Sequence, residues 1–115
     1  MKIRSAYFKV TDMAGAVAFW SSFLLQEPVK QSEHWSEFLL GEVRLGFLLN
    51  DFAEEIRGNS CVPVFELAQT ELVASVNRAK SLGATVVLDG LANPKMNGIV
   101  MAAPSGHEFE LINCR

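Results

Sequence analysis

The stretch Ala103-Pro104-Ser105-Gly106-His107-Glu108-Phe109-Glu110-Leu111-Ile112-Asn113 lies almost at the C-terminal end of the sequence. Its Pro-Ser-Gly portion predicts a tight turn, because these residues favour the backbone angles that turns need. Residues 108–111 alternate between charged and apolar side chains. Such alternation is typical of a strand with one face on a core and the other toward a polar space. Glu110 is the one acid that its position alone marks as a candidate site residue.

Length and composition predict one globular domain. The chain has 115 residues, 50% of them hydrophobic and 20% charged, which is enough to bury a single core. The net charge is −3 and no strongly basic cluster occurs. We therefore expect no nucleic-acid partner, because phosphate neutralisation needs a concentrated basic face. The apolar run in the first helical region is far shorter than the roughly 20 residues that span a bilayer, so we expect no membrane partner.

The cysteines and the opening residues bear on the compartment. Cys61 and Cys114 form no C-x-x-C motif and are too few for a disulfide framework. No basic-then-apolar leader with a cleavage site opens the sequence. We therefore expect a reduced, cytoplasmic protein.

The first half of the chain predicts a strand, a helix and then further strands. Residues 1–11 alternate as a strand, Thr11 or Asp12 is a suitable helix N-cap, and apolar residues follow at helical spacing from residue 13. Pro28 disfavours helix at the residue before it, so the helix should end near residue 25 or 26. Residues 29–34 are ambiguous and could form a short edge strand.

Gly41-Glu42 predicts a two-residue hairpin turn between two apolar segments. This register places Glu37 opposite Gly46. One face of the hairpin is then largely core, whereas the other carries Trp35, Glu37, Leu39, Arg44, Gly46 and Leu48. A face that mixes Trp, Glu, Arg and Gly is typical of a pocket wall, and a plain solvated sheet face explains it equally well.

The second half repeats this order of elements after a polar stretch at residues 51–59, which we interpret as a linker. Residues 61–67 predict a strand, with Pro63 where no neighbour needs its N–H. We expect Thr70 to cap a helix that ends at Gly83. A strand at residues 86–88, a loop at 89–98 and a hairpin of residues 99–103 and 107–113 complete the chain.

The predicted fold class is α+β, with one domain over residues 1–115 built from two βαβββ modules. Module 1 covers about residues 1–50 and module 2 about residues 60–115. The duplication rests on element order, since no repeat is visible by residue identity. Two curved half-sheets, each with one helix behind it, would together wrap a single cleft.

Three short motifs carry a resemblance to a known superfamily. The opening motif V-x-D-x-x-x-A-x-x-F-[YW] is matched by Val10, Asp12, Ala16, Phe19 and Trp20. The L-G-A motif at residues 82–84 and the closing P-x-G-[NH]-x-[FI]-E-[LI] motif at residues 104–111 follow in order. The chain thus resembles the vicinal oxygen chelate superfamily of glyoxalase I, bleomycin resistance proteins and extradiol dioxygenases. The resemblance implies a curved mixed sheet around a cleft, which pairing with a second chain completes.

The resemblance also implies where a metal would be held. Metal-dependent members place four ligands on the first and last strands of the modules, and the equivalent positions here are Ser5, Gly46, Cys61 and Glu110. Glu110 is the only normal ligand for Zn, Ni, Mn or Fe in a set that needs three. Ala103 also replaces the usual Asp of the closing turn, and Leu25-Gln26 stands where many members have Leu-Gly. We therefore expect no cofactor, with a divalent metal as the alternative.

The candidate ligand-binding residues are Tyr7, Trp35, Glu37, Arg44, Phe65, Glu108 and Glu110. The aromatic side chains could stack on a planar or cationic group, or pack against one another or a partner. Glu37 and Arg44 could anchor a polar ligand or pair with each other across the hairpin. Glu110 could bind a cation or act as a base, which would require a raised pKa, or be a partly solvated acid without a role.

The remaining reactive residues suggest no catalytic group. We expect Cys61 to be a small buried hydrophobe rather than a nucleophile. His107 should lie at the hairpin surface, and His34 belongs to no metal-binding pattern. No nucleotide-binding or nucleophile-elbow motif occurs.

Three functions remain open at this point. The leading hypothesis is a metal-independent, homodimeric small-molecule-binding protein of the bleomycin-resistance type, whose cleft is aromatic and acidic and takes a cationic or polar ligand. The first alternative is a metal-dependent lyase, isomerase or dioxygenase of the same superfamily. The second is a non-catalytic scaffold with a vestigial cleft.

Overall fold

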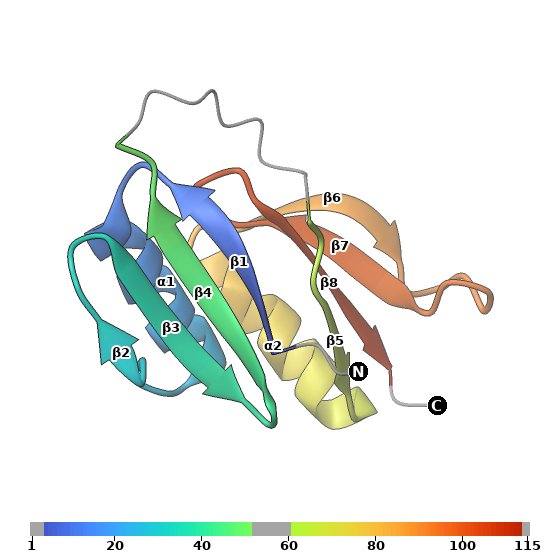
Figure 1. Cartoon of the computed structure of the whole chain (residues 1–115). Helices are drawn as coiled ribbons and strands as arrows, with labels where there is room; N and C mark the ends of the chain where they lie inside the picture. Colours follow the sequence, from blue (N-terminus) through green and yellow to red (C-terminus); the bar gives the residue numbers. More distant parts are fainter. Residues whose placement is uncertain (1–3, 52–60, 114–115) are drawn as a thin grey trace. The chain divides into compact units, whose positions relative to one another are not determined.

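The structure is a computed structural model that describes residues 4–51 and 61–113. The chain divides into two compact units, unit 1 over residues 1–57 and unit 2 over residues 58–115. The predicted linker lies almost entirely outside the described residues, as does Cys114. Each unit has one helix and one four-stranded mixed sheet (Figure 1).

Unit 1 follows the order strand, helix and three strands. Its elements are β1 (Ser5–Val10), α1 (Met13–Leu24), β2 (Lys30–Gln31), β3 (Trp35–Leu40) and β4 (Val43–Leu49). The strands lie in the order β1-β4-β3-β2, with β1 parallel to β4 and the other pairs antiparallel. The hairpin pairs Glu37 with Gly46, as predicted, and Gly41 has the positive φ of 62° that favours glycine at this turn.

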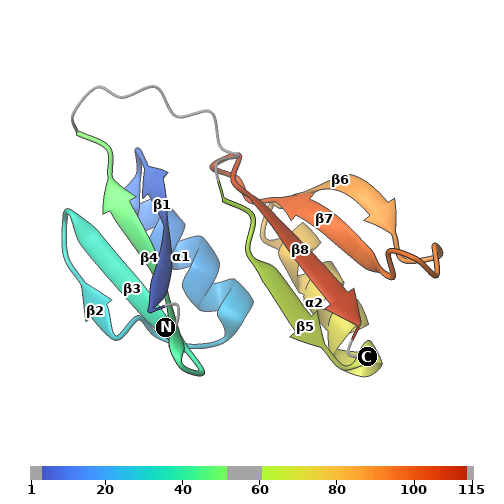
Figure 2. The same cartoon turned by 45° about the vertical axis from the view of Figure 1, so that its right-hand side comes forward.

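Unit 2 repeats the same order. Its elements are β5 (Val64–Leu67), α2 (Gln69–Ser81), β6 (Thr85–Gly90), β7 (Gly98–Ala102) and β8 (Glu108–Asn113). The strands lie in the order β5-β8-β7-β6, and β5 runs parallel to β8 (Figure 2). The prediction of an α+β fold made of two βαβββ modules is therefore confirmed.

The core of unit 1 lies between α1 and one face of its sheet, and it is largely aromatic. Trp20 of α1 packs against Phe8 and Phe47, with ring centroids 6.1 Å and 5.9 Å away, and Phe38 meets Phe47 edge-to-face at 5.9 Å. All four rings are buried. Truncating such a ring to alanine typically costs about 3–5 kcal/mol.

The core of unit 2 is mainly aliphatic. The buried residues of α2 include Leu72, Val76 and Ala79, and those of the sheet are Ile99, Met101, Phe109 and Leu111. Alternate residues of β7 and β8 therefore face the helix, as the two-residue period of a strand requires. None of the helices in residues 4–51 and 61–113 is long and apolar enough to cross a membrane.

The two helices begin differently. Asp12 caps α1 as predicted, because its Oδ1 accepts a hydrogen bond from the Gly15 amide at 3.0 Å. The predicted Thr70 cap of α2 is wrong, since the N-cap is Ala68 and no side chain caps the helix. The Leu72 amide bonds to the Ala68 carbonyl at 2.8 Å. Because Leu72 is buried in the core, we attribute the earlier helix start to packing of the first turn.

Several predicted boundaries shift by a few residues. The strand predicted from residue 61 begins at Val64, after Pro63. Pro63 has no N–H, yet its carbonyl accepts a hydrogen bond from the Glu110 amide at 2.9 Å. The predicted loop at residues 89–98 is shorter, because β6 and β7 pair as far as Gly90 and Gly98.

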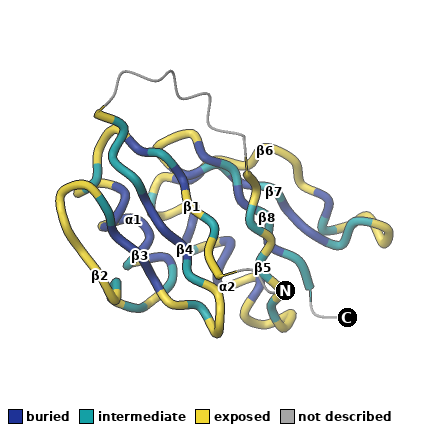
Figure 3. Tube along the Cα trace, viewed as in Figure 1, coloured by how far each residue is buried: buried dark blue, intermediate teal, exposed yellow. Residues whose placement is uncertain are grey.

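The edge strands β2 and β6 are unlike each other. β2 is two polar residues long, whereas β6 has six residues and exposes Val86, Val87 and Leu88 by 41%, 50% and 55% (Figure 3). The pairing with β7 shifts register between Val86 and Leu88. An exposed apolar edge strand favours pairing with another chain.

The end of α1 carries a strained residue. Leu25 has a φ of 58° and is 71% exposed. The left-handed position at the end of this helix is therefore Leu25 itself, one residue before the position at which the family resemblance aligned a glycine. A left-handed conformation costs an L-residue roughly 1–2 kcal/mol, and the exposed Leu25 side chain gains little from packing to offset this cost.

We therefore expect Leu25→Gly to raise the free energy of unfolding by about 0.5–1 kcal/mol, after the entropic cost of glycine in the unfolded chain is deducted. Urea unfolding monitored by circular dichroism measures the change. Gln26→Gly is the contrasting variant, because Gln26 has no positive φ and its Nε2 donates to the Leu39 carbonyl at 3.0 Å. That variant should be destabilised, and an equal loss in Leu25→Gly would contradict the assignment of strain.

Candidate functional site

The candidate site lies on the face of the unit 1 sheet that is turned away from α1, here called the outer face. Successive side chains of a strand point to opposite faces. The outer face is therefore formed by the residues that alternate with the buried Phe8, Phe38 and Phe47. The outer face carries Ser5, Tyr7, Lys9, Lys30, Trp35, Glu37, Leu39, Arg44, Gly46 and Leu48. Four of the predicted ligand-binding residues are thus brought together on one sheet.

Trp35 lies across Gly46 of the neighbouring strand. A Cβ atom added to Gly46 would meet the six-membered ring of Trp35, with Cζ2 at 2.5 Å, and would lie 3.2 Å from the Tyr7 Cβ. Real Cβ atoms essentially never come this close to another atom. Gly46 is therefore required for the position of the indole, and its lack of a side chain is a packing feature.

Tyr7 and Trp35 form an aromatic pair on the outer face. Their ring centroids are 5.6 Å apart with an interplanar angle of 66°, an edge-to-face arrangement. Tyr7 is 49% exposed, and Trp35 is partly buried. The pair offers aromatic surface that the core does not use.

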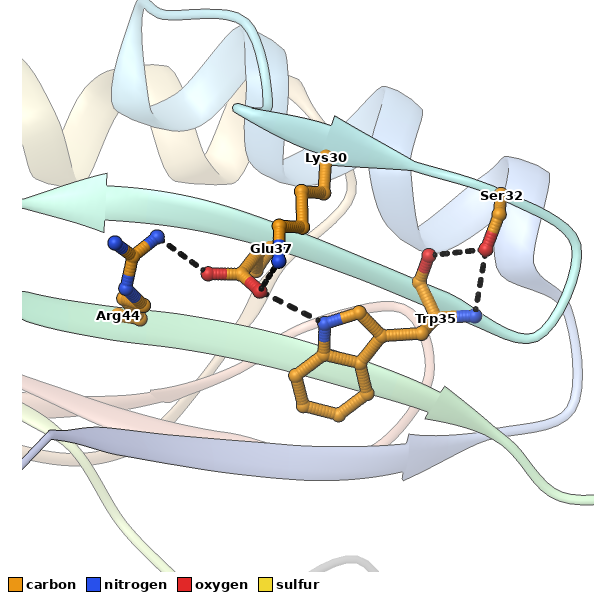
Figure 4. A network of polar contacts seen from close by, with 5 residues as sticks. All are labelled: Lys30, Ser32, Trp35, Glu37 and Arg44. Carbon is orange, nitrogen blue, oxygen red and sulfur yellow. Dashed lines mark hydrogen bonds and ion pairs between the residues drawn. The ribbon is translucent and has the colours of Figure 1, made fainter.

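Glu37 is the centre of a polar network (Figure 4). Trp35 Nε1 donates to its Oε1 at 3.0 Å, Arg44 Nη1 donates to its Oε2 at 2.8 Å, and Lys30 Nζ lies 3.9 Å from Oε1. The Glu37 side chain is only 6% exposed. The pairing of Glu37 with Arg44 across the hairpin, one of two predicted alternatives, is present.

The network lowers the pKa of Glu37 below its ordinary value of 4.5. The hydrogen bonds from Trp35 and Arg44 are the main causes, while desolvation opposes them and the charges of Arg44 and Lys30 add to the lowering. Glu37 is therefore a carboxylate at neutral pH, and its charge is matched by two cations.

The other three predicted ligand-binding residues belong to unit 2 and do not share one face. Glu108 and Glu110 are partly buried and lie on the face turned away from α2, and Glu110 is paired with Val64 and Val100. Phe65 pairs with the buried Leu111 and meets Phe109 edge-to-face at 6.4 Å, so it lies on the core face. The structure thus separates Phe65 from the two acids.

Two expectations about reactive residues are wrong. His107 is 6% exposed rather than at the hairpin surface, and its Nδ1 lies 2.9 Å from the Ser105 hydroxyl, within the tight turn that Gly106 makes with a φ of 93°. Cys61 is exposed rather than buried, because β5 begins three residues later. His34 is on the surface and pairs with Asp51 at 3.1 Å.

Sequence reasoning missed two contributors to the site. Lys30 was not selected because residues 29–34 gave no clear strand pattern, and only the pairing of Lys30 with Glu37 places it there. Gly46 was predicted to lie on the mixed face of the hairpin and at a family ligand position, but no packing role was assigned to it. Its position opposite Glu37 in the hairpin was predicted, and a tryptophan two residues before Glu37 on the same face was the available signal.

The chain is similar to known proteins along nearly its whole length. Residues 5–112 match the family described as "Glyoxalase-like domain". The chain belongs to this glyoxalase-like family. No curated protein sequence matches the chain.

Solved structures share the fold at low sequence identity. Protein ATC0852 from Agrobacterium tumefaciens has a TM-score of 0.85 and 15% identity, covering 100% of this chain and 98% of that one. A glyoxalase/bleomycin resistance protein/dioxygenase family enzyme from Burkholderia phytofirmans PsJN has a TM-score of 0.80 and 17% sequence identity, and the match covers 98% of each chain. The fosfomycin resistance protein FosX from Mesorhizobium loti has a TM-score of 0.73 and 16% sequence identity, and the match covers 100% of this chain and 92% of that one. The resemblance predicted from the sequence is therefore confirmed.

The residues at the family's metal-ligand positions do not fit a metal in unit 1. The resemblance assigns Ser5 and Gly46 to this unit, and Ser5 offers only a hydroxyl, which is a weak donor. Any ligand side chain at position 46 would collide with the Trp35 ring. The space beside Gly46, where the resemblance places a ligand side chain in metal-dependent members, is occupied here by the Trp35 ring.

We expect Gly46→Ala to lower the free energy of unfolding by about 1–3 kcal/mol, because the added methyl group displaces Trp35 or strains the strand. The displacement also breaks the bond from Trp35 Nε1 to Glu37, which the indole N–H resonance in a ¹⁵N–¹H spectrum reports. The Trp35→Ala background is the control, since there the same alanine has room. An equal cost in both backgrounds would show that Trp35 is not what excludes a side chain.

Glu37→Gln should destabilise the protein by about 1 kcal/mol at neutral pH, because a partly exposed charge-assisted network is weakened. Since the folded pKa of Glu37 is lowered, its contribution is complete above about pH 4.5 and is lost as the pH falls through the lowered value. The stability difference between wild type and variant should therefore shrink in acid. Urea unfolding across the acid range measures it, and a difference that stays constant would contradict the lowered pKa.

Proposed function

We propose that the chain is a metal-independent small-molecule-binding protein whose ligand is held against the Tyr7–Trp35 pair on the outer face of unit 1. The observation that carries the proposal is the indole of Trp35 over Gly46, where the resemblance places a metal ligand in metal-dependent members. An aromatic ring at this position supplies a stacking surface and takes the space that a coordinating side chain needs.

The surrounding contacts support a preorganised binding surface. The Trp35 ring lies against the backbone of Gly46, meets Tyr7 edge-to-face, and donates a hydrogen bond from Nε1 to Glu37. Glu37 is in turn held by Arg44. A ring fixed in this way loses little conformational freedom when a planar ligand stacks on it, which favours affinity.

Two further expectations remain proposals. We infer a homodimer, and the exposed apolar residues Val86, Val87 and Leu88 on β6 support association with a second copy. Sedimentation velocity of the purified chain would test it, and a monomer at all concentrations would contradict it. A cytoplasmic location, expected from the number and spacing of the cysteines and the opening residues, also stays a prediction.

Protein purified without a metal-chelating tag should contain no stoichiometric transition metal, and dialysis against EDTA should leave its melting temperature unchanged. A thermal-shift screen of planar organic compounds should in contrast find ligands that raise it by several degrees, because saturating ligand stabilises the folded state by mass action. Trp35→Leu should abolish the shift, and Val73→Ala, an exposed position on α2, should retain it.

Two results would contradict the proposal. One is a bound metal whose removal lowers the melting temperature, which would favour a metal-dependent lyase, isomerase or dioxygenase. The other is a ligand shift that survives in Trp35→Leu, which would place the ligand elsewhere.

A further inference from the structure

We propose that the ligand of the outer face is a planar aromatic anion, stacked on Trp35 and paired with the guanidinium of Arg44. The inference rests on the proposed function and names the ligand class for the same site. It differs from the expectation of a cationic ligand in an acidic cleft, which followed from the acidic residues in the sequence.

The charge of the outer face is the first step. Its described residues include three cations, Lys9, Lys30 and Arg44, and one acid, Glu37. Both Arg44 and Lys30 lie within ion-pair distance of Glu37. Among the described residues around Glu37, one carboxylate cannot neutralise both Arg44 and Lys30, so this part of the outer face has an excess of positive charge and attracts anions.

Arg44 retains donors for a ligand. Of its side-chain nitrogens, only Nη1 donates to a described residue, Glu37, at 2.8 Å. A guanidinium has five N–H donors in a planar fork that matches a carboxylate. Its side chain is 29% exposed, so a ligand can reach the remaining donors. Glu37 holds the group in place, which reduces the entropy lost when a second anion binds.

The positions of Trp35 and Arg44 allow one small ligand to contact both. Trp35 Nε1 and Arg44 Nη1 donate to the two oxygens of the same carboxylate. The indole and the guanidinium therefore flank Glu37 on one face of the sheet (Figure 4). A flat ring with an anionic substituent can stack on the first and reach the second.

A cation is the competing occupant, because an indole attracts positive charge through its quadrupole. Because Trp35 is only partly buried, this attraction is closer to the few-fold gain of an exposed ring than to the larger gain of a desolvated one. A charge-assisted hydrogen bond from Arg44 to an anion is worth about ten-fold or more. Arg44 and Lys30 would also repel a cation. The balance therefore favours an anion.

Three probes of the same shape and different charge test the inference: 2-naphthoate, 2-naphthalenemethanol and 2-naphthylmethylammonium. The chain has two tryptophans, so the ¹⁵N–¹H spectrum contains two indole signals, which Trp35→Phe assigns. Trp20 is 1% exposed and serves as the internal control. Titration with a probe that binds should shift the Trp35 indole signal and leave the Trp20 signal unchanged. Naphthoate should bind about ten-fold more tightly than either of the other two probes.

Arg44→Gln should weaken naphthoate about ten-fold and leave naphthalenemethanol unchanged, with the spectrum itself showing that the variant is folded. Arg44→Lys, which keeps the charge and loses the fork, should give an intermediate loss. Lys80→Gln on the exposed side of α2 makes the same change in net charge and should have no effect.

The outcomes separate this inference from the proposed function. If all three probes bind equally, or the cation binds best, the outer face is a ligand site and the anion inference is overturned. A preference for naphthoate that survives Arg44→Gln would overturn the role of Arg44. If no probe moves the Trp35 signal, the proposed function fails together with the inference.

Discussion

The close approach of an indole ring to a glycine backbone determines the character of the outer face of unit 1. Gly46 on β4 leaves room for Trp35 on β3, and a single Cβ atom would remove that room. With the ring in place, its N–H reaches Glu37, and Glu37 in turn holds Arg44. The positions of the aromatic ring and of the cationic group therefore both depend on the missing side chain at Gly46.

The two units use the same topology for different surfaces. The resemblance aligns Gly46 in unit 1 with Glu110 in unit 2, and the strand registers then align Trp35 with Gly98. In unit 2 the glycine is on the other strand, and a Cβ there would meet Ile112 Cγ2 at 2.7 Å. Unit 2 thus has a similar close approach between Gly98 and the aliphatic side chain of Ile112. Glu110 pairs with Val64 and Val100, neither of which is a cation. The same topology therefore presents an aromatic face in unit 1 and an acidic, aliphatic face in unit 2.

The sequence predicted the fold well because the patterns that specify it are local. The alternation of the strands, the glycine of the hairpin turn and the Asp12 cap each act within a few residues, and the hairpin register followed from them. The sequence could not supply the contacts that override local preference. Ala68 rather than Thr70 caps α2 because Leu72 is packed, and Lys30 reaches Glu37 only through the tertiary pairing of a two-residue strand. For the site, the four residues on unit 1 were predicted, whereas the direction of the Trp35 ring depends on side-chain packing that no spacing rule encodes.

The state of Glu37 decides which chemistry the outer face can perform. A general base at neutral pH needs a pKa raised toward 7, usually by burial without a partner. Glu37 has donors on both oxygens, and these lower its pKa. A proton on this carboxylate would remove the charge that strengthens the bonds to Trp35 and Arg44, so proton transfer at Glu37 would weaken the contacts that orient both side chains. The same contacts that make Glu37 a poor base make it a positioning residue for Trp35 and Arg44.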